Sequence, residues 1–384
     1  MTTSTAPPKK TASRPSIPTH VTIRLWVAAG GRCQFDGCNS PLWKNDLTME
    51  ELNLACRAHI YAYSPDGPRY DPVLSPKLET DFSNLMLVCG KCHPTFDNKS
   101  LVGHYTPELL MNMKRMHEER IERVTGIAPE KRSHVLLFGA KVGEHDSPLR
   151  FKEAANAMFP DRYPSGPAVE LGLKNGSFRD RDRAFWEVEP QHLERQFAEK
   201  VAALKNNDQV QHYSLFGFAP IPLLMKLGVL LGDIYPADVY QLRREPTSWK
   251  WDDKGKDVQH EVRAPMNTTG KIALKLELSA TIPDQRVIDV LGPDCSIWSV
   301  THPSPGNDYI RTRSHLEDAR RAFRVVMTQI MARTPQPLEV HGFPAMPLST
   351  AVEFGRVRMP KADPRLVVYD EYNGFHHALT IERN

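Results

Sequence analysis

Apolar residues follow a helical period in one long segment of the N-terminal third and are sparse at the start of the chain. Residues 1–18 are rich in Thr, Ser, Pro and Lys without any apolar period, which predicts a disordered tail. From Pro107 to about Thr125, apolar residues recur near helical spacing with charged residues between them, which predicts a helix. Pro107 suits its first turn and Gly126 its C-terminal end, and we interpret residues 127–134 as a linker.

After residue 134 short apolar runs alternate with helical segments. Residues 135–139 are an apolar run that ends in glycine, as a buried parallel strand would. Helical spacing returns near residues 149–158 and 189–205, and residues 213–218 have the composition of a strand. This alternation predicts an α/β architecture.

One pattern occurs twice in this C-terminal region. Residues 216–223 have the sequence FGFAPIPL and are followed by Gly228, and residues 341–348 have the sequence HGFPAMPL and are followed by Gly355. Each copy has the pattern of a strand, a Gly/Pro turn, a helix and a second strand, so we expect two Rossmann-like units of common origin. Ligands of such sheets bind beyond the carboxyl ends of the strands, and backbone amides at a helix start suit a phosphate.

Length and charge limit the class of protein. The 384 residues are enough for two or three domains. There is no stretch of 18 apolar residues and no secretory signal, so we expect a soluble, cytoplasmic protein with no membrane partner. Residues 1–134 hold 17 Lys and Arg against 14 Asp and Glu, so the net charge of +3 lies in this part. This agrees with a DNA partner, although a solvated surface could carry the same excess.

Four cysteines form two short pairs, which have the spacing of a structural zinc site. Thiolates are soft ligands, and four of them make a closed tetrahedral cage that stabilises a small module. The pairs are Cys33-x4-Cys38 and Cys89-x2-Cys92. Disulfides are the alternative, but the cysteine density is not that of a secreted scaffold. Cys56 and Cys295 fit neither pair, and we interpret them as buried apolar residues.

Two histidines and an asparagine accompany these cysteines, in the order Ala58-His59-Ile60, Asn84-Leu85 and Cys92-His93. With the cysteine pairs, this order resembles the HNH endonuclease family over roughly residues 20–105. The resemblance implies a ββα-metal core, an α+β domain that we assign to residues 19–126. It also implies that His59 is the general base, that His93 binds the catalytic divalent cation (Mg²⁺ or similar), and that Asn84 orients the loop that carries His59. Imidazole suits the base because its ordinary pKa lies near neutrality.

The sequence departs from the commonest family pattern at Ala58, where many members carry an acidic metal ligand. Asp66, Asp71 and Asp97 are the local candidates for the missing oxygen ligand. Plainer interpretations also exist. His93 could replace a cysteine at the zinc, His59 could be an ordinary hairpin residue, Asn84 a turn residue, and the whole module a zinc fold without activity.

The repeated turns of residues 135–384 resemble the SAVED domain, in which two CARF-like units sense cyclic oligonucleotides. An HNH module followed by SAVED resembles the Cap5-type effectors of bacterial CBASS anti-phage defence. That resemblance implies a cyclic di- or trinucleotide activator, a double-stranded DNA substrate, and self-association into a dimer or tetramer on activation. The competing hypotheses are an ungated restriction-type nuclease whose C-terminal region binds DNA, and a zinc-containing binding protein without activity.

Candidate nucleotide contacts follow from the same pattern. Pro222 and Pro347 lie in the two repeated turns, and Lys141 follows the first strand. Trp249, Trp251 and Tyr369 could stack on a base, although burial in the core is an equally good interpretation. His302, Pro303 and Arg311 follow a strand-like run. For Lys141 and Arg311 the alternative is an exposed ion pair.

Overall fold

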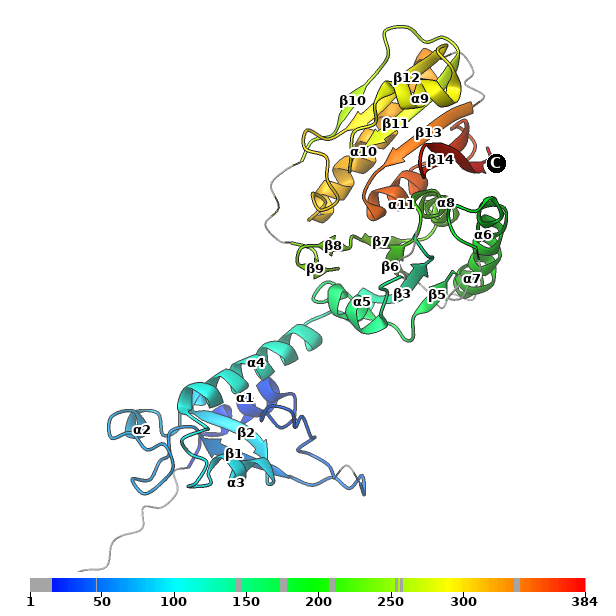
Figure 1. Cartoon of the computed structure of the whole chain (residues 1–384). Helices are drawn as coiled ribbons and strands as arrows, with labels where there is room; N and C mark the ends of the chain where they lie inside the picture. Colours follow the sequence, from blue (N-terminus) through cyan, green and yellow to red (C-terminus); the bar gives the residue numbers. More distant parts are fainter. Residues whose placement is uncertain are drawn as a thin grey trace, which may run out of the picture. The chain divides into compact units, whose positions relative to one another are not determined.

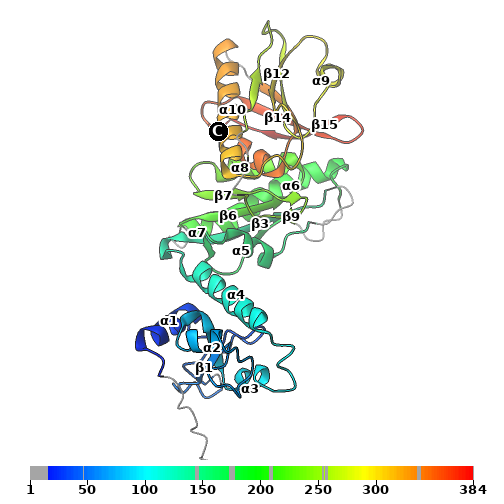
Figure 2. The ribbon, with the colours of Figure 1, turned by 90° about the vertical axis from the view of Figure 1, so that its left-hand side faces the viewer.

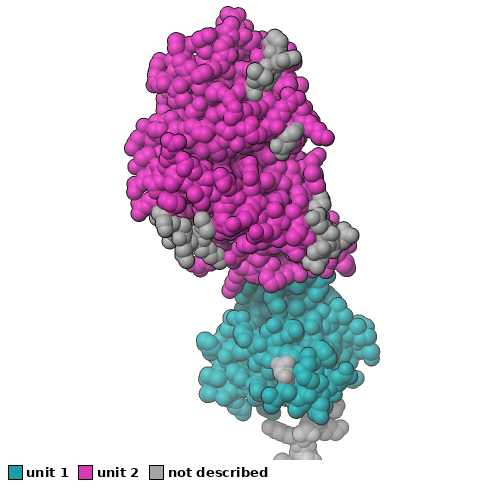
Figure 3. Space-filling model, turned by 90° about the vertical axis from the view of Figure 1, so that its right-hand side faces the viewer, with its two compact units in different colours: residues 1–128 teal, residues 129–384 magenta. Residues whose placement is uncertain are grey.

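The computed structural model describes residues 16–45, 47–142, 147–172, 178–206, 211–252, 255, 258–334 and 339–383. The chain divides into two compact units, Met1–Ala128 and Pro129–Asn384 (Figure 3). The predicted tail lies outside the described residues except for residues 16–18. The expected linker at 127–134 is too long, because a short 3₁₀ turn occupies Pro129–Lys131 and strand β3 begins at Arg132.

The first unit contains two antiparallel strands, β1 (Ala55–His59) and β2 (Leu85–Cys89), which pair from Ala55 opposite Cys89 to His59 opposite Leu85 (Figure 1). Helix α2 (Leu74–Lys77) and the 3₁₀ turn Phe82–Asn84 lie between them in the chain, and α3 (Cys92–Phe96) follows β2 directly. From β1 to α3 the order is therefore strand, short helix, 3₁₀ turn, strand and helix.

Two longer helices complete this unit. Helix α1 (Thr19–Ala29) packs against α4 (Pro107–Thr125), and the ring Nε2 of His117 lies 2.9 Å from the carbonyl oxygen of Ala29. The bounds of α4 confirm the helix expected from the sequence, and the Thr106 side chain caps it by accepting a hydrogen bond from the amide of Leu109. Every residue of β2 is buried, which makes this strand the centre of the small core.

The second unit is α/β and consists of two halves, each with its own sheet (Figures 1 and 2). In the first half the strand order is β4-β3-β6-β7, with β5 also paired to β3, and all of these pairings are parallel. The strands are β3 (Arg132–Gly139), β4 (Tyr163–Pro164), β5 (Val169–Leu171), β6 (Tyr213–Phe218) and β7 (Ala237–Tyr240). The helices are α5 (Phe151–Met158), α6 (Arg183–Gln196), a π-helical turn (Phe197–Ala202), α7 (Ala203–Asn206) and α8 (Ile221–Leu231). A small hairpin, β8 (Arg243–Arg244) and β9 (Thr247–Ser248), follows β7.

The second half has the strand order β10-β12-β11-β13-β14-β15, in which the four central strands are parallel and the two edge strands antiparallel. The strands are β10 (Glu261–Arg263), β11 (Lys271–Glu277), β12 (Cys295–Thr301), β13 (Glu339–Ala345), β14 (Arg365–Glu371) and β15 (Phe375–Ile381). The helices are α9 (Asp284–Leu291), α10 (Arg313–Arg333) and α11 (Leu348–Arg356).

The sequence repeat corresponds to a structural repeat. β6, α8 and β7 form one strand–helix–strand unit, and β13, α11 and β14 form the other, with a parallel strand pair in each. Helices α8 and α11 pack against each other, and one hydrophobic core runs through both halves. The expected α/β architecture is thereby confirmed. None of the described helices combines the length and apolar character that a bilayer crossing requires.

Candidate functional site

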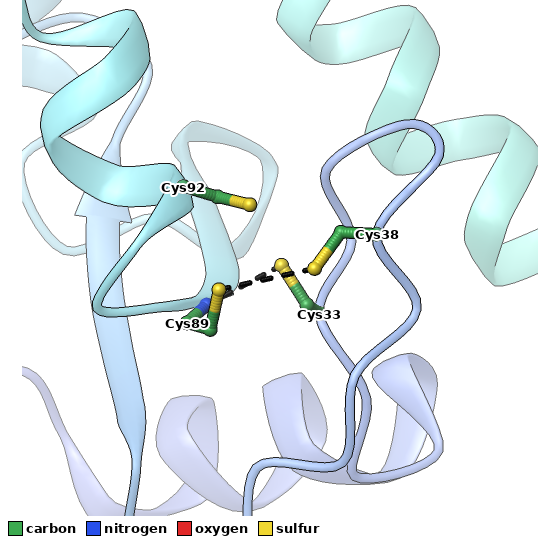
Figure 4. Close-up of side chains that lie close together, drawn as sticks. All are labelled: Cys33, Cys38, Cys89 and Cys92. Carbon is green, nitrogen blue, oxygen red and sulfur yellow. Dashed lines mark hydrogen bonds between the residues drawn. The ribbon is translucent and has the colours of Figure 1, made fainter.

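The four paired cysteines converge on one point of the first unit (Figure 4). Cys33 and Cys38 lie on the loop after α1, Cys89 ends β2, and Cys92 begins α3. Their sulfur atoms all lie within 4.8 Å of one another. The Sγ atoms of Cys38 and Cys89 are 3.8 Å apart, whereas a disulfide bond is about 2.05 Å long. The six cysteines are free thiols, so the structure does not contain the disulfides considered from the sequence.

The electrostatics of this cluster suit a soft divalent cation. Burial raises the pKa of Cys33 to about 12 and also raises that of Cys92. Burial acts in the same direction on Cys38, but hydrogen bonds, the largest of them from Ser40, bring its pKa down to about 7. Four thiolates this close repel one another, and a divalent cation at their centre offsets this repulsion. The donor set therefore fits Zn²⁺, held by sulfurs alone.

Asn84 joins the chain after β1 to the start of β2. Its side chain is completely buried. The Oδ1 atom accepts a hydrogen bond from the amide of Tyr61 (2.7 Å), and Nδ2 donates to the carbonyl oxygens of Tyr61 and Leu78, each at 3.1 Å. Two of these hydrogen bonds fix Tyr61, two residues after His59, and the third ties Leu78 to the same side chain, which is the geometry that a loop-orienting amide requires.

His59 is the last residue of β1, and only 8% of it is exposed. Its Nε2 atom lies 2.8 Å from the carbonyl oxygen of Glu79. Because a carbonyl oxygen can only accept, Nε2 carries the hydrogen in this contact. The neutral ring then has its lone pair on Nδ1, which is the nitrogen that could accept a proton.

His93 lies in the short helix α3, one turn before Asp97. The Nε2 atom of His93 and the Oδ2 atom of Asp97 are 3.1 Å apart, and both side chains are about one third exposed. Burial would raise the pKa of Asp97, but hydrogen bonds from His93 and Arg69 outweigh it and lower that pKa below its ordinary value. Of the three acids considered from the sequence, Asp97 is thus the one beside His93. Asp71 instead accepts hydrogen bonds from the amides of Val73 and Leu74 at the start of α2, and Asp66 is exposed.

Arg69, which the sequence did not single out, connects the chain after His59 to the helix that carries His93. Its side chain is 2% exposed. It donates to the carbonyl oxygens of Ile60 (2.8 Å) and Phe96 (2.6 Å) and to Oδ1 of Asp97 (2.5 Å). Within the described parts of the chain, the four cysteines are the only set of three or more close potential metal ligands. His93 and Asp97 alone would thus supply two ligands, and water or substrate the others.

In the second unit a cavity of about 390 Å³ lies at the carboxyl ends of strands from both halves. Helices α8 and α11 begin beside it, and Phe218, Gln241, Ala345 and Glu371 mark where β6, β7, β13 and β14 end. This is the position at which open parallel sheets bind ligands. The size is that of a small-molecule site.

The charged groups of the cavity come from both halves. Among its described lining residues the basic ones are Arg244 of the first half and Arg286 of the second. Arg286 forms an ion pair with Glu371 at 2.8 Å. Burial, together with the charges of Asp180 and Glu371, raises the pKa of Asp370 to about 7. Asp370 lines this cavity and also a second one of about 720 Å³ that includes Trp186 and Tyr372.

The structure brings some of the expected nucleotide contacts to the cavity. Pro347 lines it directly, and Lys141 is exposed next to Val142, which also lines it. Pro222 is instead buried within the first turn of α8, where its neighbour Ile221 reaches the cavity.

The aromatic candidates are packing residues rather than stacking platforms. Trp249 is 4% exposed and packs edge-on against Phe216, and Trp251 packs against Tyr240. Tyr369 stacks on Phe343 with ring centroids 4.6 Å apart. None of these three tryptophan and tyrosine candidates is among the residues that line the cavity. The hydrophobic interior of the two halves holds these rings, where burial of their large apolar surface is favourable.

His302, Pro303 and Arg311 lie in the connection from β12 to α10. The ring of His302 stacks on Tyr309 with centroids 4.3 Å apart, and Arg311 lies 3.5 Å from a carboxylate oxygen of Asp252. None of the three lines the cavity. The sequence reasoning missed Arg244 and Arg286. Arg244 follows the end of β7 by four residues, whereas Arg286 lies in α9, after a strand (β11) that the sequence analysis did not predict.

Comparison with known protein families finds a match within the second unit. Residues 193–381 match the SAVED family, described as the SMODS-associated and fused to various effectors sensor domain. No curated protein is a significant match to the chain.

Solved structures of low sequence identity resemble the chain. One is the Acinetobacter baumannii Cap4 SAVED/CARF-domain containing receptor with the cyclic trinucleotide 2'3'3'-cAAA, with 11% identity, a TM-score of 0.43, and coverage of 80% of this chain and 61% of that one. Another is the Moraxella osloensis Cap4 SAVED/CARF-domain containing receptor, with 9% identity, a TM-score of 0.38, and coverage of 74% and 60%. This chain thus spans about three fifths of the length of those receptors.

Proposed function

We propose that this chain, which carries a SAVED sensor domain at residues 193–381, is a metal-dependent DNA endonuclease of anti-phage defence that a cyclic oligonucleotide switches on. The observation that carries the sensor part is the cavity where the strand ends of both SAVED halves meet, with one arginine from each half. Two separated cations suit a ligand with more than one phosphate, and the starts of α8 and α11 add backbone amide dipoles. A cyclic di- or trinucleotide has that chemistry.

The nuclease part of the proposal rests on the arrangement of His59, Asn84 and His93 around β1, β2 and α3. Asn84 and Arg69 fix the chain beside His59, and Asp97 lies beside His93. In the proposed reaction His59 takes a proton from water while the water oxygen bonds to the phosphorus of a DNA phosphodiester. The bond from phosphorus to the leaving oxygen breaks, and that oxygen gains a proton from solvent.

His93 and Asp97 would hold the divalent cation, which when bound stabilises the charge that develops on the phosphate and the leaving oxygen. Zn²⁺ in the cysteine cluster would have a purely structural role, because four sulfurs leave no open position for a substrate. Cleavage of duplex DNA through backbone contacts implies weak sequence selectivity. We also expect activation to involve self-association, as a dimer or tetramer.

Plasmid digestion tests this function. Purified protein is incubated with supercoiled plasmid and Mg²⁺, with and without each member of a panel of cyclic diadenylate, cyclic diguanylate and cyclic triadenylate. We expect nicking and linearisation only with Mg²⁺ and one of the nucleotides. Cutting without any nucleotide would favour an ungated restriction-type nuclease. Nucleotide binding without cutting would favour a binding protein that has no nuclease activity.

A further inference from the structure

We propose that Asp308 latches the two SAVED halves together and positions Arg244 at the rim of the nucleotide cavity. This inference rests on the proposed sensor function. Residues 302–311, which we call the latch segment, connect β12 to α10 in the second half. Arg244 belongs to the β8–β9 hairpin of the first half and lines the cavity. Asp308 is not among the lining residues, so its effect on a ligand would act through Arg244.

The contact between the halves is a carboxylate that accepts backbone hydrogen bonds. The amide of Arg244 lies 3.1 and 3.2 Å from the two carboxylate oxygens of Asp308, and the amide of Glu245 lies 3.3 Å from one of them. Hydrogen bonds to an ionised acceptor are stronger than neutral ones. They fix the backbone from which the Arg244 side chain extends.

The latch segment is itself anchored on the second half by a chain of three side chains. Nδ1 of His260 lies 2.8 Å from Oδ2 of Asp318, and Nε2 of His260 lies 2.8 Å from the hydroxyl of Tyr309. The carboxylate accepts from Nδ1, so Nε2 accepts the hydrogen of Tyr309. Burial lowers the pKa of His260 and raises that of Tyr309, which keeps the ring neutral and the hydroxyl protonated. The ring of His302 stacks on Tyr309 from within the same segment.

Two further contacts place the latch segment at the cavity. The amide of Gly306 donates to the carbonyl oxygen of Leu278 (3.1 Å), and its neighbour Asn307 lines the cavity. At the other end, the carbonyl oxygen of Arg311 accepts from the amide of Asp252 (2.8 Å), and Asp252 forms an ion pair with Arg243 of the hairpin. The segment therefore contacts its own half at Gly306 and the chain that follows the hairpin at Arg311, with Asp308 between these two points.

The consequence concerns which ligands the cavity binds. Arg286 has a partner in Glu371 within its own half, whereas the backbone of Arg244 is held by the opposite half. A ligand phosphate at Arg244 and another at Arg286 would be bound together only while Asp308 is in place. We infer that the cavity binds the nucleotide with high affinity only while Asp308 joins the two halves. Asp308 thus acts as a positioning residue.

Two measurements on the full chain test the latch. In hydrogen exchange without nucleotide, Asp308→Ala should speed exchange of the Arg244 and Glu245 amides about tenfold or more, because an exposed amide loses its protection. Asp308→Asn keeps one acceptor oxygen and should have an intermediate effect. Asp289→Ala removes an exposed carboxylate of α9, whose partner is Gln285, and should leave these two amides unchanged. Unchanged exchange in Asp308→Ala would overturn the latch itself.

The second measurement uses the cyclic nucleotide from the panel above that the wild type binds most tightly. Its affinity for each variant is measured by calorimetry at several salt concentrations. We expect Asp308→Ala and Arg244→Gln each to weaken binding about tenfold, and the double variant to lose little more than either single one, because they remove the same interaction. Both single variants should also show a shallower salt dependence. Faster exchange with unchanged affinity would overturn the positioning role alone. Absence of binding by the wild type would overturn the proposed sensor function and the positioning role with it.

Discussion

Gly228 of α8 and Gly355 of α11 lie in direct contact where helices from the two halves of the second unit cross. A Cβ atom on Gly228 would lie 2.0 Å from the carbonyl oxygen of Val352 and 2.9 Å from the Cα atom of Gly355. A Cβ atom on Gly355 would lie 2.1 Å from the carbonyl oxygen of Met225. The obstacles are backbone atoms, so a side chain at either position forces the helices apart. The two repeat glycines thus set how closely the halves approach.

Replacing either glycine should therefore loosen the association of the halves. We expect Gly228→Ala to lower the free energy of unfolding of the second unit by about 1–3 kcal/mol, as overpacking of a tight core does. Scanning calorimetry of the full chain would record a lower transition temperature. Gly166→Ala is the matched control, because a Cβ atom there meets nothing within 4 Å. Equal stability of the Gly228→Ala and Gly166→Ala variants would contradict the close-contact argument.

The cysteine cluster leads to a prediction about metal content. We expect one zinc ion per chain in purified protein, measured by elemental analysis, and its loss in Cys92→Ser together with unfolding of the first unit. Cys56→Ser keeps the four clustered sulfurs and should keep both zinc and fold. Chelation should reproduce the effect of Cys92→Ser. Full zinc occupancy in Cys92→Ser would show that this cysteine is not a ligand.

Asp370 should make nucleotide binding depend on pH. Its pKa is raised to about 7, chiefly by burial and then by the charges of Asp180 and Glu371. Below that pH the carboxyl group is neutral, and above it a negative charge faces a cavity that we expect to hold anionic phosphates. Affinity should therefore fall as the pH rises from 6 to 8 in the wild type, and much less in Asp370→Asn.

The same shift has a consequence for stability. The folded state binds this proton more tightly than the unfolded state, whose carboxyl group has an ordinary pKa of about 3.9. The stabilisation from the bound proton is complete below pH 4 and is lost as the pH rises through about 7. Asp370→Asn should therefore raise the unfolding temperature relative to the wild type more at pH 8 than at pH 5. A constant difference across this range would indicate that the carboxyl group titrates normally.

Local patterns in the sequence predicted helices and strands of this structure. They did not predict the contacts between segments that are far apart in the chain. The helix Pro107–Thr125 and the strand Tyr213–Phe218 have the expected bounds because period and turn residues mark them locally. The spacing of the cysteines likewise implied their convergence, which the structure confirms.

The candidate nucleotide contacts show what local sequence patterns cannot predict. Trp249 follows β9 and Tyr369 lies within β14, but the side on which each ring packs depends on tertiary neighbours such as Phe216 and Phe343. Arg244 is placed by Asp308, which lies 64 residues away in the sequence. No local pattern contains that information, since the hydrogen bonds arise only when the halves come together.

Arg69 offers a test of the proposed nuclease site that is separate from His59 itself. Its guanidinium group contacts the carbonyl oxygen of Ile60, next to His59, and the carboxylate of Asp97, next to His93. A planar group with several donors is needed for this geometry, and lysine has only a single ammonium group. We therefore expect Arg69→Lys to retain the zinc and the nucleotide affinity but to reduce the rate of plasmid cutting by about tenfold to a hundredfold, since small misplacements of catalytic groups are costly.

The comparison with His59→Ala separates positioning from chemistry. His59→Ala should abolish cutting at every Mg²⁺ concentration, with nucleotide affinity unchanged, because the base itself is gone. In Arg69→Lys, Asp97 loses its fixed orientation beside His93, so the Mg²⁺ concentration for half-maximal cutting should rise while some activity returns at high Mg²⁺. A titration of nicking rate against Mg²⁺ for both variants and the wild type measures this difference. An Arg69→Lys enzyme with the Mg²⁺ dependence and rate of the wild type would show that Arg69 supports the fold and not the site.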